Sequence, residues 1–598
     1  MFQKFDIQTT PETGPERLAA LRGAMADTGV DGFLVPRADA HQGETVPPCD
    51  ERLRWLTSFT GSAGMAVATA GRAAIFVDGR YTLQAREQVS DAFDKRGHGD
   101  AALAAWLIEA LPEGGTVGFD PWLHATAQIE RLEAALSPAG IMLKPIANLV
   151  DAVWSDRPDA PAAPMVLQPE ALAGASAEEK REAIAADLRQ RGSRAALITL
   201  PDSIAWLLNV RGGDIARMPV ALGFAIVHDD ATVETFGFID KAGDDIRAAL
   251  GNAVSFSPRD AFLPAIGGLS GTVSLDRATA PIAVVEALRA AGATPDWHEP
   301  IALPKARKTA AEIAGARSAH LRDGIAMARF LAWLDREAPG GGLTEIDVCR
   351  RLEAFRAETG EMRDISFETI CGAGPNGAIV HYRVNEASNR AVRPGELLLV
   401  DSGAQYRDGT TDITRTLAVG DAGEDERRAF TLVLKGMIAI SRARWPAGLS
   451  GRDLDPLARI ALWREGFDYA HGTGHGIGSY LGVHEGPQRI ARISEVPLEP
   501  GMMLSNEPGY YREGAFGIRI ENLVVVTEAE TPQGGDLPML GFETLTLAPI
   551  DRRLVATHLL DPEERGWLNA YHARVHGAVG PHLDDGTRRW LQDACAPI

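Results

Sequence analysis

Two patterns of apolar positions alternate along the first third of the chain. Residues 15–28 carry apolar side chains at helical spacing, and the short apolar run 32–35 follows them as an expected strand. The same order returns later, with a helical pattern over 178–190 and a strand-like run over 195–198. The pattern therefore predicts two α/β units in tandem.

A second signature supports this internal similarity. An acidic residue stands four positions before a Trp-Leu pair in both units, Glu51 before Trp55 and Asp202 before Trp206, and a glycine follows each Trp six residues later. We interpret the match as a repeat in which the first unit carries an insertion around 41–50.

The pattern changes to α+β in the second half of the chain. A long amphipathic helix is expected with Ile325, Phe330, Leu331 and Leu334 on one side, and a helical tail is expected from Asp561 onward. Between them we expect strands at 397–400, 413–419 and 517–526 and helices at 424–443 and 452–464.

Pro-rich and Ala-rich stretches mark the expected domain boundaries. The chain is 598 residues long, too long for one hydrophobic core, and linkers are expected at 156–175 and near 295–308. We expect N-terminal domains at 1–160 and 161–304, a third domain at 305–545 and a C-terminal helical extension at 546–598.

Composition narrows the functional class only a little. The formal net charge of −21 argues against nucleic acid or an anionic membrane as the main partner. The four cysteines are scattered without a CxxC pair, so neither a disulfide framework nor a zinc knuckle is indicated. The N-terminus lacks the apolar run of a signal peptide and no stretch reaches transmembrane length, so a cytoplasmic protein is expected.

Two carboxylates flank a predicted hairpin in the third domain. Asp401 ends the apolar run 397–400, and Asp412 opens the next strand eleven residues later. The glycines between them suit a turn that would bring both carboxylates to its inner face. Two neighbouring buried carboxylates repel unless a cation or a proton compensates them, whereas a helix cap and a surface turn would need neither.

A cluster of histidines lies in the glycine-rich segment HGTGHGIGSYLGVHEGP. It contains His471, His475 and His484, three of the 14 histidines of the chain within fourteen residues. Imidazole is a common metal ligand and proton carrier, and glycines allow the backbone to approach a ligand closely. The segment lacks the GKS or GKT of a phosphate-binding loop.

Two glutamates complete the candidate set. Glu507 precedes a Pro-Gly turn, and Glu521 lies fourteen residues later within an apolar strand-like run. Either alone could be a solvated side chain. Together, the three segments supply four carboxylates and one imidazole, with no thiolate, a set suited to hard or borderline divalent cations. Two such cations with bridging carboxylates would suit hydrolysis of an amide or a phosphate ester.

The order Asp, Asp, His, Glu, Glu resembles the pita-bread metallopeptidases. The segments FETICGAGPNGAIVHY, DSGAQYRDGTTDITRT, HGTGHGIGSYLGVHEGP and EPGYYREGAFGIRIEN resemble the long, three-domain cytosolic aminopeptidase P group of that family. The resemblance extends to DAHQGETVPPCDERLRWLTSFTGSAG in the first domain and departs nowhere at the metal positions. It implies two creatinase-like α/β units in tandem, followed by an α+β pita-bread catalytic domain.

The resemblance also implies a role for each candidate residue. Asp401 would bind one metal, Asp412 and Glu521 would bridge two, and His475 and Glu507 would complete the second. Glu507 would also act as general base on a hydroxide-forming water between the metals. His381 would contact the substrate at the scissile bond, and His484 would stabilise the tetrahedral intermediate. His471 would line the proline pocket. Tyr511 and Arg519 would support the site or line the pocket.

The expected activity is release of the first residue from peptides with proline in second position. The expected cofactors are two divalent metal ions, Mn2+ first, with Co2+ or Zn2+ as alternatives, and the expected assembly is a homodimer. The alternatives are a prolidase acting on Xaa-Pro dipeptides and a catalytically silent pita-bread binding module. A creatinase-like amidinohydrolase would share the fold but lack the metal ligands.

Overall fold

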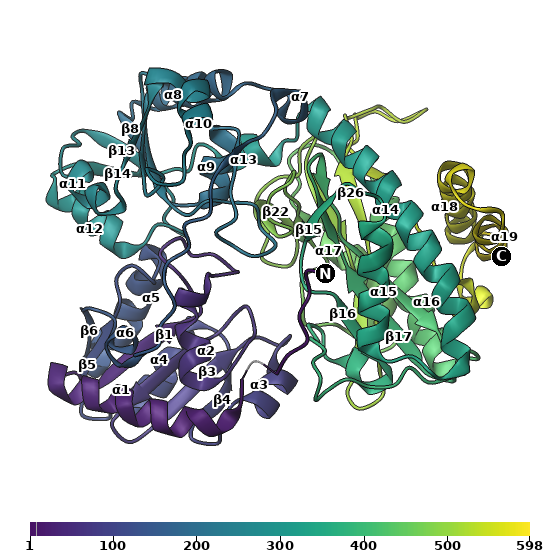
Figure 1. Ribbon diagram of the computed structural model, residues 1–598, viewed down its shortest axis with the longest axis horizontal. Coiled ribbons are helices and arrows are strands. Elements are labelled where there is room, and N and C mark those ends of the chain that lie inside the picture. The colour runs from purple at the N-terminus through teal and green to yellow at the C-terminus, as the bar shows by residue number, and fades with distance from the viewer. Residues whose placement is uncertain (8) are drawn as a thin grey trace. The chain divides into compact units, whose positions relative to one another are not determined.

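The computed structural model describes residues 1–7 and 9–598, and their contacts form two compact units (Figure 1). The C-terminal unit consists of Leu303–Ile598 with the segments Met1–Ile7 and Ala171–Gly174. The N-terminal unit consists of Gln8–Glu170 and Ala175–Ala302. The expected ranges 1–160 and 161–304 thus fall largely within one unit, and the exact domain boundaries stay a prediction.

The N-terminal unit contains two six-stranded sheets with the same topology. The strand orders are β4-β3-β2-β1-β5-β6 and β12-β11-β10-β8-β13-β14. In each sheet the inner hairpin strands pair antiparallel, and the remaining neighbours pair in parallel. The strands are β1 (Gly32–Pro36), β2 (Met65–Thr69), β3 (Ala73–Val77), β4 (Asp94–Gly97), β5 (Gly115–Phe119), β6 (Ile141–Pro145), β8 (Ala195–Ile198), β10 (Phe224–His228), β11 (Val233–Phe236), β12 (Val254–Ser257), β13 (Thr272–Leu275) and β14 (Thr294–Trp297).

The helices of this unit confirm the predicted tandem repeat. Trp55 lies in the helix that follows the first strand of one sheet, and Trp206 lies in the corresponding helix of the other. The helices predicted over 15–28 and 178–190 are also present. The helices are α1 (Gly14–Thr28), α2 (Arg52–Thr57), α3 (Thr82–Gln88), α4 (Asp100–Ala110), α5 (Thr126–Leu136), α6 (Leu149–Val153), α8 (Ala177–Arg191), α9 (Pro201–Leu207), α10 (Asp244–Leu250), α11 (Phe262–Ile266) and α12 (Ile282–Ala290).

The predicted long helix of the C-terminal unit is α14 (Ala310–Glu337), which follows the short helix α13 (Ala302–Ala306). Thr309 and Glu312 form a capping box at its N-terminus, which satisfies backbone N–H groups that the helix itself leaves unpaired. Phe330, Leu331 and Leu334 are buried on one side of this helix and pack into a core shared with the strands of the unit. The helices of the unit are α13 (Ala302–Ala306), α14 (Ala310–Glu337), α15 (Glu345–Ala357), α16 (Glu424–Ser441), α17 (Gly451–Trp463), α18 (Pro562–Val579) and α19 (Asp585–Ala594).

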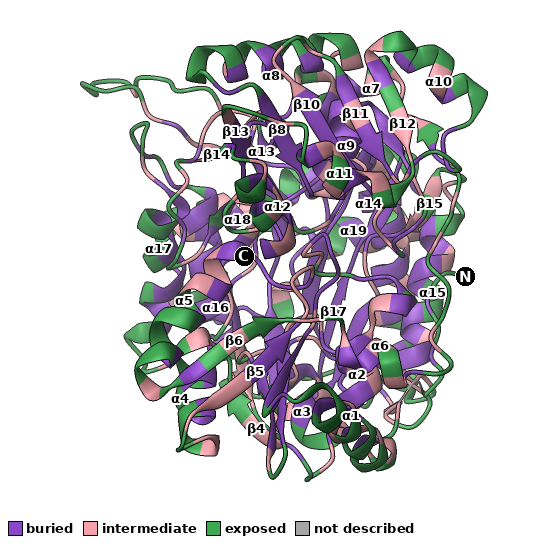
Figure 2. Cartoon of the chain, turned by 90° about the vertical axis from the view of Figure 1, so that its left-hand side faces the viewer, coloured by how far each residue is buried: buried purple, intermediate pink, exposed green. Residues whose placement is uncertain are grey.

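The strands of this unit form small antiparallel sheets, ordered β15-β18-β19, β16-β17-β20, β22-β21-β23-β26-β27 and β24-β25. Figure 2 shows β17 buried, like β8, β10 and β11 of the N-terminal unit, and helices with exposed outer faces. The strands are β15 (Met362–Ile365), β16 (Ile370–Ala373), β17 (Leu397–Ser402), β18 (Ala404–Tyr406), β19 (Gly409–Thr410), β20 (Ile413–Ala418), β21 (Gly474–Gly476), β22 (Glu485–Ile490), β23 (Met503–Asn506), β24 (Gly509–Arg512), β25 (Phe516–Arg519), β26 (Asn522–Val526) and β27 (Phe542–Thr544).

One expected strand is divided in two. The run 517–526 was expected as a single strand, but β25 ends at Arg519 and β26 begins at Asn522. At the break, the backbone N–H of Glu521 donates to the carbonyl of Thr414 (3.2 Å) instead of continuing either strand ladder. The single-strand prediction is therefore wrong, because a contact with a distant strand ends the local pairing.

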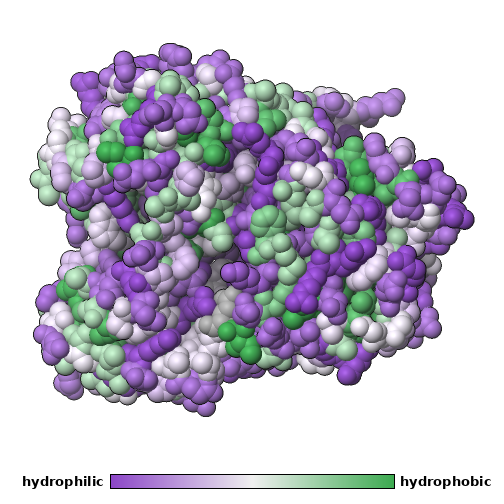
Figure 3. Space-filling model, viewed as in Figure 1, coloured by the Kyte–Doolittle hydropathy of each residue, from purple (hydrophilic) through white to green (hydrophobic). Residues whose placement is uncertain are grey.

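The surface and the helices add two observations. On the face shown in Figure 3, apolar residues lie in small groups among hydrophilic ones. Within residues 1–7 and 9–598, no helix combines the length and the apolar character that a membrane crossing requires.

Candidate metal centre

Asp401 and Asp412 are brought together by the hairpin of β17 and β20. In the antiparallel register Asp401 lies opposite Thr414, only two residues beyond Asp412. Both aspartates are buried, and the negative charge of Asp401 helps to raise the pKa of Asp412. The residues between them form a second hairpin, β18–β19, which joins another sheet. The predicted proximity of the two carboxylates is confirmed.

His475 presents its Nε2 atom to the carboxylates. It lies in β21, where its Nδ1 atom is 3.0 Å from the carbonyl oxygen of Gly476. Nδ1 therefore donates to this carbonyl, and Nε2 is the ring nitrogen that would bind a metal. That Nε2 atom lies 3.3 Å from Oε1 of Glu507 and 3.6 Å from Oδ2 of Asp412.

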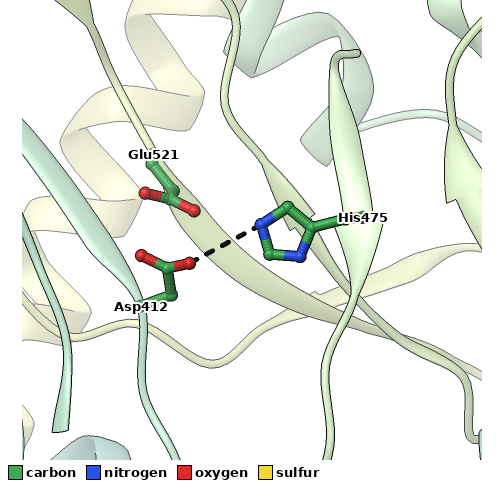
Figure 4. Close-up of side chains that lie close together, drawn as sticks. All are labelled: Asp412, His475 and Glu521. Carbon is green, nitrogen blue, oxygen red and sulfur yellow. Dashed lines mark ion pairs between the residues drawn. The ribbon is translucent and has the colours of Figure 1, made fainter. Parts of the chain in front are cut away.

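Glu521 completes the group from the break between β25 and β26. Its Oε2 atom accepts a hydrogen bond from Thr414 Oγ1 (2.8 Å). One ligand atom each of Asp412, His475 and Glu521 lies within 4.8 Å of the others, and Figure 4 shows the three side chains pointing toward one another. Asp401 and Glu507 flank this group.

Buried oxygen atoms without hydrogen-bond partners fit a cation at this point. Oδ1 of Asp401, Oδ1 of Asp412 and Oε1 of Glu521 are all buried and have no partner. Burial, followed by the charges of neighbouring carboxylates, raises the pKa of Asp412 and of Glu521 well above the usual range. Burying such carboxylate oxygens costs free energy unless a positive charge compensates them. The residues therefore fit divalent cations.

Glu507 lies beside this group in a setting that suits proton transfer. Burial raises its pKa to about 7, the charge of Asp401 adds to the rise, and Arg519 and His484 oppose it. Its Oε1 atom accepts a hydrogen bond from Ser505 Oγ at 2.9 Å. A carboxylate with a pKa near neutral pH can both accept and release a proton.

A chain of hydrogen bonds runs from the carboxylates to His471. Arg519 donates to Oδ2 of Asp401 through Nη2 (2.6 Å) and to Tyr511 OH through Nη1 (2.6 Å). Burial raises the pKa of Tyr511 to about 12, so the hydroxyl keeps its proton and donates to Nε2 of His471 (2.9 Å). Tyr511 and Arg519 therefore join the metal centre to the histidine expected to line the proline pocket.

The two remaining histidines differ in how the structure places them. The ring of His484 lies 4.2 Å from that of His475, centroid to centroid, in an edge-to-face arrangement. His381 is half-buried in the turn after the 3-10 helix Gly374–Ala378, and the carbonyl of the preceding Val380 accepts a hydrogen bond from Arg519 Nη2 (3.3 Å). His484 is thus beside a candidate ligand, and the residue before His381 is held by Arg519.

Sequence reasoning missed two residues that hold the candidate ligands. Thr414 donates to Glu521, and Ser505 both donates to Glu507 and accepts from the backbone N–H of His475 (3.0 Å). Asp412 directly precedes β20 and Thr414 follows it by two positions, so strand alternation could have indicated Thr414. Ser505 had no comparable signal.

Comparisons with known families agree with this architecture. Residues 314–528 match metallopeptidase family M24, and residues 538–598 match the C-terminal region of peptidase M24. Residues 17–153 and 156–312 each match the creatinase/prolidase N-terminal domain. The tandem N-terminal domains are therefore matched separately from the domain that carries the candidate ligands.

Full-length relatives share the whole arrangement. A probable Xaa-Pro aminopeptidase P of Aspergillus flavus is 40% identical over 100% of this chain and 94% of its own length. One of Aspergillus niger is also 40% identical, over 98% of both chains. The crystal structure of X-prolyl aminopeptidase from Caenorhabditis elegans, described as a cytosolic enzyme with a di-nuclear active site, superposes with a TM-score of 0.92 at 34% identity, covering 98% of this chain and 100% of that one. The chain therefore belongs to metallopeptidase family M24, within its aminopeptidase P group.

Proposed function

We propose that this protein is a two-metal aminopeptidase that releases the first residue from peptides with proline in second position. The observation that carries the proposal is the group of four carboxylates and one imidazole, in which three buried oxygens have no hydrogen-bond partner. The names of the Aspergillus and C. elegans relatives support the substrate class.

We assign the five candidate ligands to two cations. Asp401 would bind one metal, Asp412 and Glu521 would lie between both, and His475 and Glu507 would bind the other. The di-nuclear site described for the C. elegans enzyme supports this number. Oxygen-rich ligands with a single imidazole fit Mn2+, which we propose as the metal, with Co2+ or Zn2+ as alternatives.

The bound cations would supply Lewis acidity, which lowers the pKa of water and polarises a peptide carbonyl. Glu507 would take the proton of the attacking water and return it to the leaving amine. His484 would donate a hydrogen bond to the oxygen that gains negative charge, and His381 would contact the substrate near the scissile bond.

Proline requires a dedicated pocket because an Xaa-Pro bond has no N–H and its ring cannot adopt the extended conformation that strand-binding peptidases recognise. We assign this pocket to His471, which Tyr511 holds by the hydrogen bond to Nε2. Nδ1 of His471 donates to the carbonyl of Gly472 at 2.7 Å, so the ring is held at both nitrogens.

The test is hydrolysis of an Arg-Pro-Pro peptide by purified protein loaded with Mn2+, with and without a chelator. Asp412→Ala should lower the rate by about three orders of magnitude or more, because this carboxylate would organise both metals. The matched control is Asp408→Ala in the same hairpin, which removes a carboxylate paired with Arg322 (3.0 Å) outside the ligand group. An active Asp412→Ala variant would refute the two-metal site.

The same assay separates the alternatives. Preferential cleavage of a bare Xaa-Pro dipeptide would indicate a prolidase, and a metal-free protein without Mn2+-stimulated activity would indicate a silent binding module. We also propose that the protein is a homodimer. Light scattering of the protein as it elutes from a size-exclusion column measures the molar mass and checks this. A cytoplasmic location is proposed from the description of the C. elegans relative as cytosolic.

A further inference from the structure

Directly behind His484 lies a buried carboxylate held by two buried ammonium groups. Lys308 Nζ donates to Oε1 of Glu485 at 2.5 Å, and Lys305 Nζ lies 3.6 Å from Oε2. The side chains of Lys305, Lys308 and Glu485 are 3%, 1% and 0% exposed. None of these residues belongs to the candidate ligand group.

This ion cluster is too costly to be explained by stability alone. Removing charges from water costs several kcal/mol per ion in real proteins, and all three charged side chains are buried here. Replacement of such a buried pair by apolar side chains is often neutral or stabilising. A role in placing a neighbouring group would account for its presence.

Glu485 is connected to the site through both its neighbours and its strand. It follows His484 directly, and while His484 is exposed, Glu485 is buried at the start of β22. In the sheet Glu485 pairs with Gly476, the residue after His475.

The glycines around Glu485 show how closely it is packed. A Cβ on Gly476 would lie 2.2 Å from the Glu485 carbonyl oxygen, and one on Gly478 would lie 2.9 Å from Oε2. The carboxylate therefore lies directly beneath the glycine-rich segment that also carries His475.

We propose that Glu485, held by Lys308 and Lys305, is a positioning residue that fixes the imidazole of His484 relative to His475. The inference rests on the proposed function for its catalytic consequence. An exposed side chain that must meet a developing negative charge needs a fixed backbone, because a misplacement of about 1 Å can cost about a hundredfold in rate. The buried ion cluster supplies that fixed point one residue away.

Lys308→Met is the variant of choice. It removes the 2.5 Å contact but leaves Lys305 Nζ 3.6 Å from Oε2 of Glu485, so the buried carboxylate still lies beside a positive charge. We expect kcat to fall by about ten- to a hundredfold with KM and bound metal per chain unchanged, and the thermal midpoint to fall because the buried carboxylate loses its hydrogen-bonded partner. A parallel loss of bound metal, or an unchanged kcat, would overturn the proposal.

A double-mutant cycle tests whether the effect passes through His484. In a His484→Ala background, Lys308→Met should cause little further loss of kcat, because the group it positions is already gone. Multiplicative losses would instead indicate a general structural role. The matched control is Arg307→Met, which removes the neighbouring but solvent-exposed ion pair with Glu499 and should leave kcat unchanged.

A chemical probe gives a result that does not depend on activity. Diethyl pyrocarbonate acylates exposed imidazoles, and mass spectrometry of the metal-loaded protein can follow the modification of His484. We expect its rate to change several-fold in Lys308→Met but not in Arg307→Met; equal rates would overturn the proposal. If wild-type protein failed to cleave Xaa-Pro peptides while this change occurred, the proposed function would fail and the positioning would stand.

Discussion

Nη2 of Arg519 donates a hydrogen bond to Oδ2 of Asp401 at 2.6 Å, and both side chains are nearly fully buried. The same guanidinium reaches Tyr511 OH and, more weakly, the carbonyl of Val380. This one planar guanidinium therefore orients the candidate metal ligand Asp401, the hydroxyl of Tyr511 that holds His471, and the backbone of Val380 next to His381. Lysine has a single compact ammonium group and cannot reproduce this geometry.

Arg519→Lys should consequently weaken metal binding and activity although it keeps the charge. Loss of a hydrogen bond to a ligating carboxylate typically costs about ten- to a hundredfold in metal affinity or activity. Metal titration and kcat/KM measure the two effects. Arg512→Lys on the adjacent strand is the control, since Arg512 forms an exposed ion pair with Asp425, and equal behaviour of the two variants would contradict the prediction.

Tyr511→Phe should affect substrate binding more than turnover. The variant removes the hydroxyl between Arg519 and His471 but keeps the ring, so His471 loses its partner at Nε2. One net hydrogen bond is worth about 0.5–1.5 kcal/mol, so KM for an Xaa-Pro-Xaa peptide should rise by about two- to tenfold. Tyr510→Phe, which loses only a long contact with Arg512 (3.4 Å), should leave KM unchanged. A fall in kcat at constant KM would assign Tyr511 to chemistry instead.

Removal of metal should make stability fall as pH rises. Burial raises the pKa of Glu507 from an ordinary 4.5 to about 7 in the metal-free protein. Between those pH values the native protein binds more protons than the unfolded chain, so the free energy of unfolding decreases with pH. The slope is at most about 1.4 kcal/mol per pH unit for one group.

The measurement is the thermal midpoint of chelated protein at pH 5, 6 and 7, beside protein saturated with Mn2+. Cations would stabilise the ionised carboxylates, so the saturated protein should not show this fall. A chelated Glu507→Gln variant should show a smaller slope than chelated wild type. Identical slopes in these two proteins would argue against burial of an ionising Glu507.

His572 should make the protein sensitive to acid. It is buried on α18, where its Nε2 accepts a hydrogen bond from the backbone N–H of Ile550 (3.1 Å). Burial, aided by the charges of Arg415 and Arg552, lowers its pKa from 6.5 to about 4. Between these values the unfolded chain binds more protons than the native protein, so stability falls as pH decreases from 6.5 to 4.

Thermal midpoints of His572→Gln between pH 7 and pH 4 check this effect. The amide has no proton to gain, so the variant should lose less stability on acidification than wild type, even if it starts from a lower midpoint. His576→Gln, on the same helix but only half-buried, serves as the control. A steeper acid loss in His572→Gln than in wild type would contradict the prediction.

Local sequence patterns predicted most helices and strands, but they did not predict where each of them ends. Apolar spacing predicted α1, α8, α14 and α16 closely, because each has one buried side and a clear beginning. The single strand expected over 517–526 was wrong at Glu521, whose backbone pairs with Thr414. Thr414 is 107 residues away, so no pattern around Glu521 could reveal the break.

The candidate site, like the secondary structure, could be predicted from the sequence only in part. Asp401 and Asp412 could be placed together because a hairpin connects them over eleven residues. The functions of Tyr511 and Arg519 were implied only by the resemblance. They depend on hydrogen bonds to His471 and Asp401, which lie in other elements. Lys308 gave no signal, because a lysine next to a predicted helix is ordinarily a solvated residue.

The sequence by itself determined the tandem α/β units, the α+β domain and the chemical types that gather around a cation. Those properties follow from local spacing and from side-chain chemistry. The tertiary structure alone decided that Glu521 leaves its strand to meet Thr414, that Arg519 links Asp401 to Tyr511, and that Glu485 is buried behind His484. The physical reason is that hydrogen bonds and buried charges act over a few ångströms, between residues that only the folded chain brings together.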